Sequence, residues 1–448
     1  MAILDREYFD ELKNVALNSL KSHEYLFLSL DGESSQFMRV NAGKVRQTGL
    51  VDDAQLSFAF VSDQNGGLRK ISRTISLSGD AITDASRIQK SIDEARSESR
   101  YLPVDPFAVL PKNYPASITE KKGNLLSPFE TANSLLSSLQ NIDLVGLYAS
   151  GTLVRAFANS AGLTHWFKTD SFLFDYSLFT KEQRALKGVL GGQTWNEQDY
   201  QNKIKEEGER LSFLENKPKK LTAGEYRVYL APHAVADLIS MLSWGGVSEA
   251  AIQQGDSPFR KIRSGEKKFS PLFNLTENFS EGTIPRWNEE GALAPEVLEI
   301  VSEGLLKNSL VNSRSEKEYK VKSNAANGGE GLRSPFVSPG KILESEISKE
   351  LGTGVYISNL HYLNWSDQPQ GRITGMTRYA CFWVENGQLQ GPIENMRFDE
   401  TIFRLFGSEL LGLTTKAFWI PEVGTYGMRS LGGSSLPGIL VSRMKFTL

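Results

Sequence analysis

Cysteine is nearly absent from this chain, whose 448 residues include a single one, Cys381. One thiol can form neither an intramolecular disulfide nor a cysteine-rich zinc site, and such a composition suits a reducing compartment. There is no apolar run of the about 18 residues that a membrane span needs, and no uninterrupted apolar stretch of the kind found in signal peptides. We therefore expect a cytoplasmic protein with no membrane partner.

A strong excess of one charge is also missing. The formal net charge is -3, with 40% apolar and 23% charged residues, which are ordinary values for a globular protein. Without a basic field, nucleic acid is not an expected partner. The length exceeds one ordinary core and predicts two or three domains.

The first half of the chain mixes helical and strand periodicity. Apolar residues at helical spacing follow Asp5 and Asp80, and the string "SPFE" at 127–130 has the pattern of a capping box with proline at the first helical position. A charged stretch, 196–216, predicts a solvated helix, and the Pro- and Lys-rich segment 101–126 predicts a surface connection. Alternation with a period of two predicts strands of an antiparallel sheet at 24–30, 35–40, 54–61, 69–78, 143–150, 153–160 and 163–179. These patterns predict an α+β N-terminal domain, 1–218.

The second half is richer in strand patterns. The segment "NKPKKLTAGE" at 216–225 combines proline, glycine and lysines, and we interpret it as the domain boundary. Strand patterns at 354–363, 373–391 and 437–446 predict a mainly β C-terminal domain, 225–448. Within it, Asn386-Gly387 predicts a two-residue type I′ hairpin turn.

Familiar catalytic motifs are not found. The sequence has no H-E-x-x-H string, no G-x-S-x-G elbow and no phosphate-binding glycine loop. The nearest metal pattern is "HAVAD", where His233 and Asp237 would share one face of a helix. These two residues are either metal ligands or a helix-start histidine with a solvated aspartate. Cys381, between Ala380 and Phe382, is interpreted as a packing residue.

Several segments, taken in order, resemble the TldD/PmbA family. They are "FANSAGLTHW" (157–166), "YRVYLAPHAVADLISMLS" (226–243), "EGTIPRWNEEGAL" (281–293), "FVSPG" (336–340) and the long C-terminal stretch 352–398. The resemblance implies an α+β N-terminal domain, a mainly β C-terminal domain and work on peptides. It further implies two types of subunit, of which the TldD type is a zinc peptidase and the PmbA (TldE) type its partner. The family also carries the label "modulator of DNA gyrase", although no segment resembles a nucleic-acid motif.

The zinc ligands of the active type have no counterparts here. In that type, H-E-x-x-x-H follows the "VVLAP" strand and a cysteine lies in a "GTCG"-like turn near the C-terminus. Counted from Pro232, the first His and the Glu of the motif fall at Ser240 and Met241, the last His at Gly245, and the cysteine at Tyr426 in "GTYG". The resemblance therefore implies that this chain has no catalytic residues and no cofactor, and that zinc belongs to a TldD-like partner.

Four residues are candidates for contacting a peptide: His361, Tyr362 and Trp383 in the β-rich segments, and Asn159 in the "NS.G" signature. An exposed sheet edge and aromatic side chains can bind an extended chain with little sequence preference. The alternative for each aromatic residue is packing between strands.

The sequence leaves three hypotheses about function open. The first is a non-catalytic subunit of a TldD-type peptidase complex that degrades or matures unfolded peptides. The second is an active metallopeptidase with an atypical site formed by His233, Asp237 and His361. The third is a self-dimeric protein that binds a peptide or metabolite and has no proteolytic role.

Overall fold

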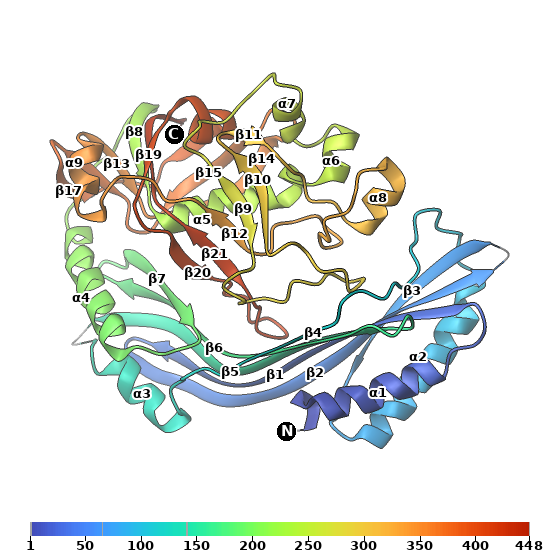
Figure 1. Cartoon of the computed structure of the whole chain (residues 1–448). Coiled ribbons are helices and arrows are strands. Elements are labelled where there is room, and N and C mark those ends of the chain that lie inside the picture. Colours follow the sequence, from blue (N-terminus) through green and yellow to red (C-terminus); the bar gives the residue numbers. More distant parts are fainter. Residues whose placement is uncertain (1, 65, 140–141, 448) are drawn as a thin grey trace.

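The computed structural model describes residues 2–64, 66–139 and 142–447 and contains three sheets. The first sheet comes entirely from the N-terminal half, and the other two come from residues from Gly224 onward. Figure 1 shows the first sheet as a long curved platform, with the C-terminal half lying over its concave side. The predicted α+β class with antiparallel sheets is confirmed.

The N-terminal sheet has the order β3-β2-β1-β5-β6-β4, with β7 paired to β6, and only β4 runs parallel to its neighbour. Its strands are β1 (Glu24–Asn41), β2 (Lys44–Gln64), β3 (Gly67–Ser76), β4 (Ser117–Lys121), β5 (Asp143–Asn159), β6 (Thr164–Phe179) and β7 (Ala185–Gly192).

The strand prediction for this half needs two corrections. The segments 24–30 and 35–40 form one strand, β1, and 143–150 and 153–160 form one strand, β5, because backbone pairing continues through the polar residues between them. The predicted surface connection 101–126 contains the short edge strand β4. A polar residue in the centre of a strand does not end that strand when both neighbouring strands continue to pair with it.

Four longer helices belong to the N-terminal half: α1 (Arg6–Asn18), α2 (Ala81–Ser99), α3 (Pro128–Leu136) and α4 (Glu197–Leu214), with a short 3-10 turn at Ala2–Leu4. The capping box predicted at Ser127 and Glu130 is confirmed, and Asp80 caps α2 by accepting from the Thr83 N–H. Asp5 lies at the N-cap of α1, but its side chain makes no capping hydrogen bond. In Figure 1, α1 and α2 cover the convex side of the sheet at one end and α3 lies at the other end.

The C-terminal half contains a nine-stranded sheet, a six-stranded sheet and short helices. The nine-stranded sheet has the order β14-β15-β18-β22-β8-β13-β16-β17, with β19 paired to β22, and the six-stranded sheet has the order β11-β10-β9-β12-β21-β20. The strands are β8 (Gly224–Leu230), β9 (Leu275–Asn278), β10 (Val297–Ser302), β11 (Leu305–Leu306), β12 (Pro335–Val337), β13 (Gly354–Ile357), β14 (Asn359–Asp367), β15 (Arg372–Arg378), β16 (Phe382–Glu385), β17 (Gln388–Pro392), β18 (Arg397–Thr401), β19 (Leu410–Leu413), β20 (Phe418–Pro421), β21 (Gly433–Leu436) and β22 (Ile439–Phe446). The helical segments are α5 (Pro232–Met241), η2 (Leu242–Gly246), α6 (Glu249–Gln254), α7 (Phe259–Arg263), α8 (Ser313–Tyr319), η3 (Glu344–Glu346), α9 (Ile347–Leu351) and η4 (Arg404–Ser408).

The hairpin predicted at Asn386-Gly387 is present: both residues have positive φ, 50° and 75°, and Glu385 pairs with Gln388. Cys381 is buried in the large C-terminal core, as its packing interpretation requires. Within the described residues, no helix is both long enough and apolar enough to cross a bilayer.

The two halves share two apolar clusters. One joins Leu186 and Leu214 of the N-terminal half to Ala380 and Phe382, and the other places Trp287 against a cluster around Phe157 of β5. Because both clusters cross the boundary at 216–225, the division into domains 1–218 and 225–448 stays a prediction.

Candidate functional site

Helix α5 and the turn that follows it carry Ser240, Met241 and Gly245, the three positions to which the family resemblance assigns zinc ligands or the catalytic glutamate. Ser240 is exposed, and its hydroxyl donates to the Asp237 carbonyl of the same helix at 2.7 Å. Met241 is 4% exposed and belongs to the large C-terminal core. Gly245 offers no side chain at all. None of these groups is an imidazole or a carboxylate, so the end of α5 does not fit a hydrolytic zinc ion, which takes such ligands.

A kink lies in η2, directly after the end of α5. Trp244 has non-helical dihedral angles and Gly245 has φ 77°. The Trp365 indole N–H donates to the Trp244 carbonyl at 3.1 Å, which satisfies a backbone acceptor that the kink removes from the helix. A Cβ on Gly245 would lie 2.7 Å from the Gln368 amide nitrogen, so a histidine there would need a local shift. The Gln368 side chain could move aside, so the feature that favours glycine at this position is its positive φ.

His233 and Asp237 share a helix but face different neighbours. Burial is the main cause that lowers the pKa of His233 from 6.5 to about 4, and the positive charges of Lys203 and Lys187 contribute to this shift. Its Nε2 is buried and has no hydrogen-bond partner among the described residues. Asp237 instead accepts the Leu360 N–H from β14 at 2.9 Å.

The Asp237 carboxyl gives a prediction about pH. Burial raises its pKa from 3.8 to about 7, which the Leu360 N–H partly opposes. Between about pH 4 and 7 the folded state therefore binds a proton that the unfolded state has lost, so this group reduces stability as the pH rises. Asp237→Asn keeps an acceptor for Leu360 and does not titrate. We expect the variant to match the wild type near pH 4 and to be more stable by about 3 kcal/mol at pH 8.

Urea denaturation of both proteins across this pH range measures the effect. His233 titrates in the same interval, but it is present in both proteins and cancels from the difference. Identical pH profiles for the variant and the wild type would contradict the prediction.

His361 and Tyr362 lie on β14, which packs on α5, and their ring centroids are 4.0 Å apart. Tyr362 is 75% exposed and has φ 52°, at an irregularity in the pairing of β14 with β15. In the parts of the chain that the structure describes, no group of three or more His, Cys, Asp or Glu side chains could hold a metal ion. His233, Asp237 and His361 therefore do not come together as a ligand set in this structure.

The other two predicted peptide contacts, Trp383 and Asn159, make contacts with other residues of the chain. The Lys219 ammonium lies over the Trp383 ring, 4.2 Å from its centroid, and Tyr226 meets this ring edge-on at 6.1 Å. Asn159 is fully buried, where its Oδ1 accepts the N–H groups of Ala161 and Leu163 and its amide donates to the Lys112 carbonyl. A buried amide with all of these bonds fixes the turn between β5 and β6.

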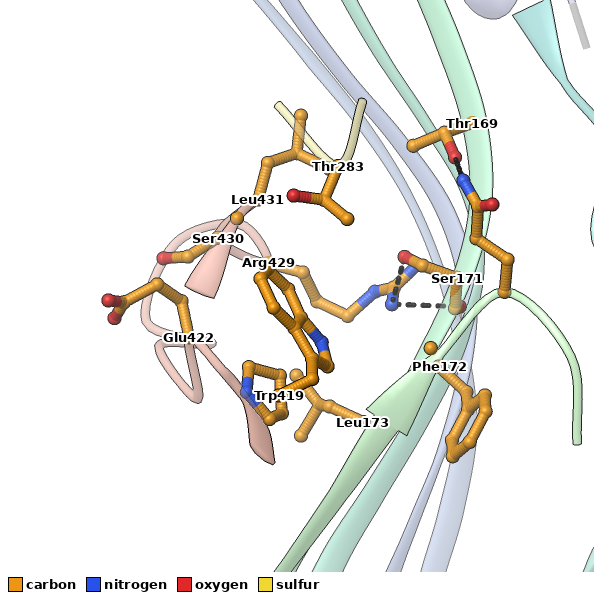
Figure 2. A pocket seen from close by; sticks show the side chains of 14 residues that line it. Thr169, Ser171, Phe172, Leu173, Thr283, Trp419, Glu422, Arg429, Ser430 and Leu431 are labelled. Atoms are coloured by element: carbon orange, nitrogen blue, oxygen red, sulfur yellow. Dashed lines mark hydrogen bonds between the residues drawn. The ribbon is translucent and has the colours of Figure 1, made fainter. Parts of the chain in front are cut away.

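Tyr426, to which the resemblance assigns the position of the family's cysteine, lies in the loop 422–432 between β20 and β21. Its side chain is completely exposed. Three residues later, Arg429 is only 3% exposed and reaches into the N-terminal sheet. Figure 2 shows this side chain extending from the loop toward Ser171 of β6, while Glu422 points away from the sheet.

Arg429 makes contacts along its whole length. Its backbone N–H donates to Glu33 at 2.8 Å, and its Nε lies 3.2 Å from the Glu33 carboxylate and 2.9 Å from the Ser35 hydroxyl. The terminal nitrogens donate to the carbonyls of Ser171 and Gly151, each at 3.0 Å. Burial lowers the pKa of Arg429, and Glu33 opposes this effect. The loop is thus fixed to three strands of the other half of the chain.

The cavity beside Arg429 measures only about 50 Å³ and lies between β6, the end of β7 and β20. Its lining includes Phe172, Leu173, Trp419 and Pro421. A water molecule takes about 30 Å³ of liquid volume, so this space suits water rather than a peptide. The contact of Arg429 with the sheet therefore serves positioning.

Two of the segments that carry the family resemblance meet in space. Trp287 of "EGTIPRWNEEGAL" stacks on His165 of "FANSAGLTHW" with centroids 4.8 Å apart and planes 7° apart. The Ser117 N–H donates to His165 Nδ1, so Nε2 carries the proton and donates to the Gly291 carbonyl at 2.9 Å. Burial lowers the pKa of His165, which keeps the ring neutral. These segments hold the two halves together.

Sequence reasoning did not identify Arg429 or His165. Arg429 has one signal in the sequence, since it is the only charged residue between Glu422 and Arg443. A single arginine in a long neutral segment is a candidate for a buried ion pair. His165 lies inside a strand pattern and carries no comparable signal.

Fold and site together describe a metallopeptidase-type scaffold without a zinc-binding group at the motif positions. Residues 223–448 match the model of the PmbA/TldA metallopeptidase C-terminal domain. The chain belongs to the TldD/PmbA family. No curated protein matches the chain.

Solved structures with the same fold cover almost the whole chain. TldE from Thermococcus kodakarensis is 12% identical with a TM-score of 0.77, covering 98% of this chain and 100% of that one. A candidate modulator of a DNA gyrase from Thermotoga maritima is 16% identical with a TM-score of 0.75, covering 98% and 99%. A similar protein from Bacteroides thetaiotaomicron, also described as a candidate modulator of DNA gyrase, is 16% identical with a TM-score of 0.75, covering 99% and 98%. At these identities, the likeness is one of fold.

Proposed function

We propose that this chain is the non-catalytic, PmbA (TldE)-like subunit of a cytoplasmic TldD-type metallopeptidase complex acting on unfolded peptides. The observation that carries the proposal is the surroundings of the motif positions. Ser240 bonds to its own helix, Met241 packs in the core, Gly245 occupies a positive-φ kink and Tyr426 points into solvent. In the proposed complex, zinc and hydrolysis belong to the TldD-like partner.

The surroundings of His233 support the same assignment. A substitute zinc site on α5 would need further ligands beside His233, and among the described residues no group of three or more His, Cys, Asp or Glu side chains could hold a metal ion. Asp237, the second residue of that site, accepts from Leu360 instead. The scaffold of the family is retained, and the proposed role of this chain is to complete the complex around the peptide.

The test compares the chain alone with the chain plus a TldD-type subunit from the same source. Purified without chelator and without its partner, the chain should contain far less than one zinc ion by elemental analysis and should not hydrolyse an unfolded peptide. Mixed with the catalytic subunit, it should form a stable complex and hydrolysis should appear. A partner whose motif glutamate is replaced by glutamine serves as the control and should form an inactive complex.

His233→Ala separates this proposal from an atypical metallopeptidase. The variant should leave the activity of the mixture unchanged. One zinc ion per isolated chain that is lost in His233→Ala, together with hydrolysis by the chain alone, would overturn the proposal. A stable self-dimer with no affinity for the catalytic subunit would instead favour a binding protein.

A further inference from the structure

Ser117 and His165 are neighbours where strand β4 pairs with β6 of the N-terminal sheet. They lie on the side of this sheet that faces the C-terminal half, since His165 also contacts Trp287 and Gly291. Ser117 Oγ is 2.8 Å from His165 Nδ1, within the about 2.6–3.2 Å at which a nucleophile and its base share a hydrogen bond. Ser117 belongs to none of the sequence motifs and has no part in the proposed peptidase role.

The hydrogen bonds around the imidazole fix the direction of the serine proton. The Ser117 backbone N–H also donates to Nδ1, at 3.1 Å, and an N–H group can only donate. Nδ1 is therefore the unprotonated nitrogen, and the Ser117 hydroxyl must donate to it as well. The proton of the ring lies on Nε2, which donates to the Gly291 carbonyl at 2.9 Å. A hydroxyl that donates to a base, which a third group holds in place, is the arrangement of a nucleophilic serine.

The imidazole is buried and neutral, whereas the hydroxyl lies closer to solvent. His165 is fully buried, and burial lowers its pKa, so the ring is an uncharged base at neutral pH. Ser117 is only partly buried, and the two residues before it, Pro115 and Ala116, are exposed. A small acyl compound can therefore approach Oγ from this side without displacing His165.

The partner of Nε2 limits the reactions that this pair can support. In a Ser-His-Asp triad, the carboxylate stabilises the imidazolium that forms when histidine takes the serine proton. In this chain, Nε2 instead meets the Gly291 carbonyl, which carries no net charge, and burial disfavours a charged ring. Acylation is therefore slow and is restricted to compounds whose leaving group departs without taking a proton. Thioesters and aryl esters meet this condition, whereas peptide amides do not.

We propose that Ser117 is a nucleophile, activated by His165, that accepts the acyl group of small activated esters such as thioesters. Ser117 Oγ attacks the carbonyl carbon while its proton passes to His165 Nδ1. The bond from this carbon to the leaving group breaks, the leaving group departs with the electron pair, and the imidazolium then releases its proton. Water hydrolyses the acyl-serine to a carboxylic acid and restores the hydroxyl. Because amides are not substrates, the isolated chain is still expected not to hydrolyse peptides.

Covalent labelling of the full chain tests the nucleophile. The probe is a fluorophosphonate, which phosphonylates an activated serine and releases fluoride, and p-nitrophenyl acetate serves as the ester. We expect the label on Ser117, located by mass spectrometry of its peptides, at a rate at least about tenfold above that of any other serine. Ser117→Ala should lose this label and the release of p-nitrophenol above background. Absence of label from Ser117 would overturn the proposal.

A cysteine exchange measures the reactivity separately from the folding of the chain. Ser117→Cys keeps a nucleophile beside His165, and Thr119→Cys, partly buried on the same face of β4, is the matched control. The single native cysteine, Cys381, is buried and does not compete for the reagent.

Iodoacetamide should alkylate the thiol of Ser117→Cys at least about tenfold faster than that of Thr119→Cys at pH 6.5, where an unperturbed thiol of pKa about 8.5 is almost entirely protonated. Circular dichroism confirms that both variants are folded. Equal alkylation rates would show that His165 does not activate this position and would refute the proposal.

Discussion

Replacing Arg429 by methionine is expected to lower the free energy of unfolding by about 3–5 kcal/mol, because it leaves a buried charge without its partner. The side chains of Arg429 and Glu33 are 3% and 5% exposed. After the substitution, the Glu33 carboxylate keeps the backbone N–H of residue 429 but loses the guanidinium. The Ser171 and Gly151 carbonyls lose donors at the same time. Urea denaturation followed by tryptophan fluorescence measures the change.

A surface arginine supplies the matched control. Arg372 lies 3.6 Å from Asp399 with its side chain 46% exposed, and Arg372→Met should cost less than about 1 kcal/mol, as exposed ion pairs do. In the double variant with Glu33→Gln, part of the loss caused by Arg429→Met should be recovered, since the unpaired charge is gone. A cost for Arg429→Met no larger than that for Arg372→Met would show that the buried pair does not hold the loop.

This ion pair explains why parts of the site could not be predicted from the sequence. Glu33 and Arg429 are separated by 396 positions, and neither lies in a pattern that selects the other. Burial of a charge depends on which strand passes beside it, which is a property of the complete fold. The neutral segment around Arg429 indicates that the residue is unusual, but it does not identify Glu33.

Features that depend on a few neighbouring residues were predicted well. The capping box at Ser127 and the hairpin turn at Asn386-Gly387 follow from local backbone chemistry, and both are present. Strand lengths were predicted less well, because the polar residues in β1 and β5 interrupt the apolar alternation but not the hydrogen-bonded ladder. Pairing with a long neighbouring strand decides where such a strand ends.

The same distinction between local and long-range features applies to the candidate site. The spacing of His233 and Asp237 correctly predicts one helix, but it cannot show that Lys187 lies near the histidine or that Leu360 binds the aspartate. Similarly, the "NS.G" signature marks a turn, yet only the fold shows that Asn159 is buried and bonded to Lys112. The surroundings of these residues are set by contacts with segments that are distant in the sequence.

Gly291→Ala is expected to be the second most damaging change, with a loss of about 3 kcal/mol or more. Gly291 has φ 80°, and a Cβ there would lie 2.3 Å from a ring carbon of Phe157 and 2.7 Å from a methyl group of Leu163. Both neighbours are buried, so neither can move aside easily. The Gly291 carbonyl also accepts from His165, so a shift of the loop would break the contact between the two signature segments.

Gly162→Ala isolates the effect of the clash. Gly162 also has positive φ, 91°, but a Cβ at this position would meet no atom within 4 Å, so alanine there should cost only the backbone strain of about 1–2 kcal/mol. Adding Phe157→Leu to Gly291→Ala removes the ring that the new methyl group meets and should recover part of the loss, whereas Phe157→Leu alone should destabilise the protein. Thermal and urea denaturation of the four variants measure these differences. If Gly291→Ala costs no more than Gly162→Ala, the packing of β5 against the loop 286–294 does not constrain this position.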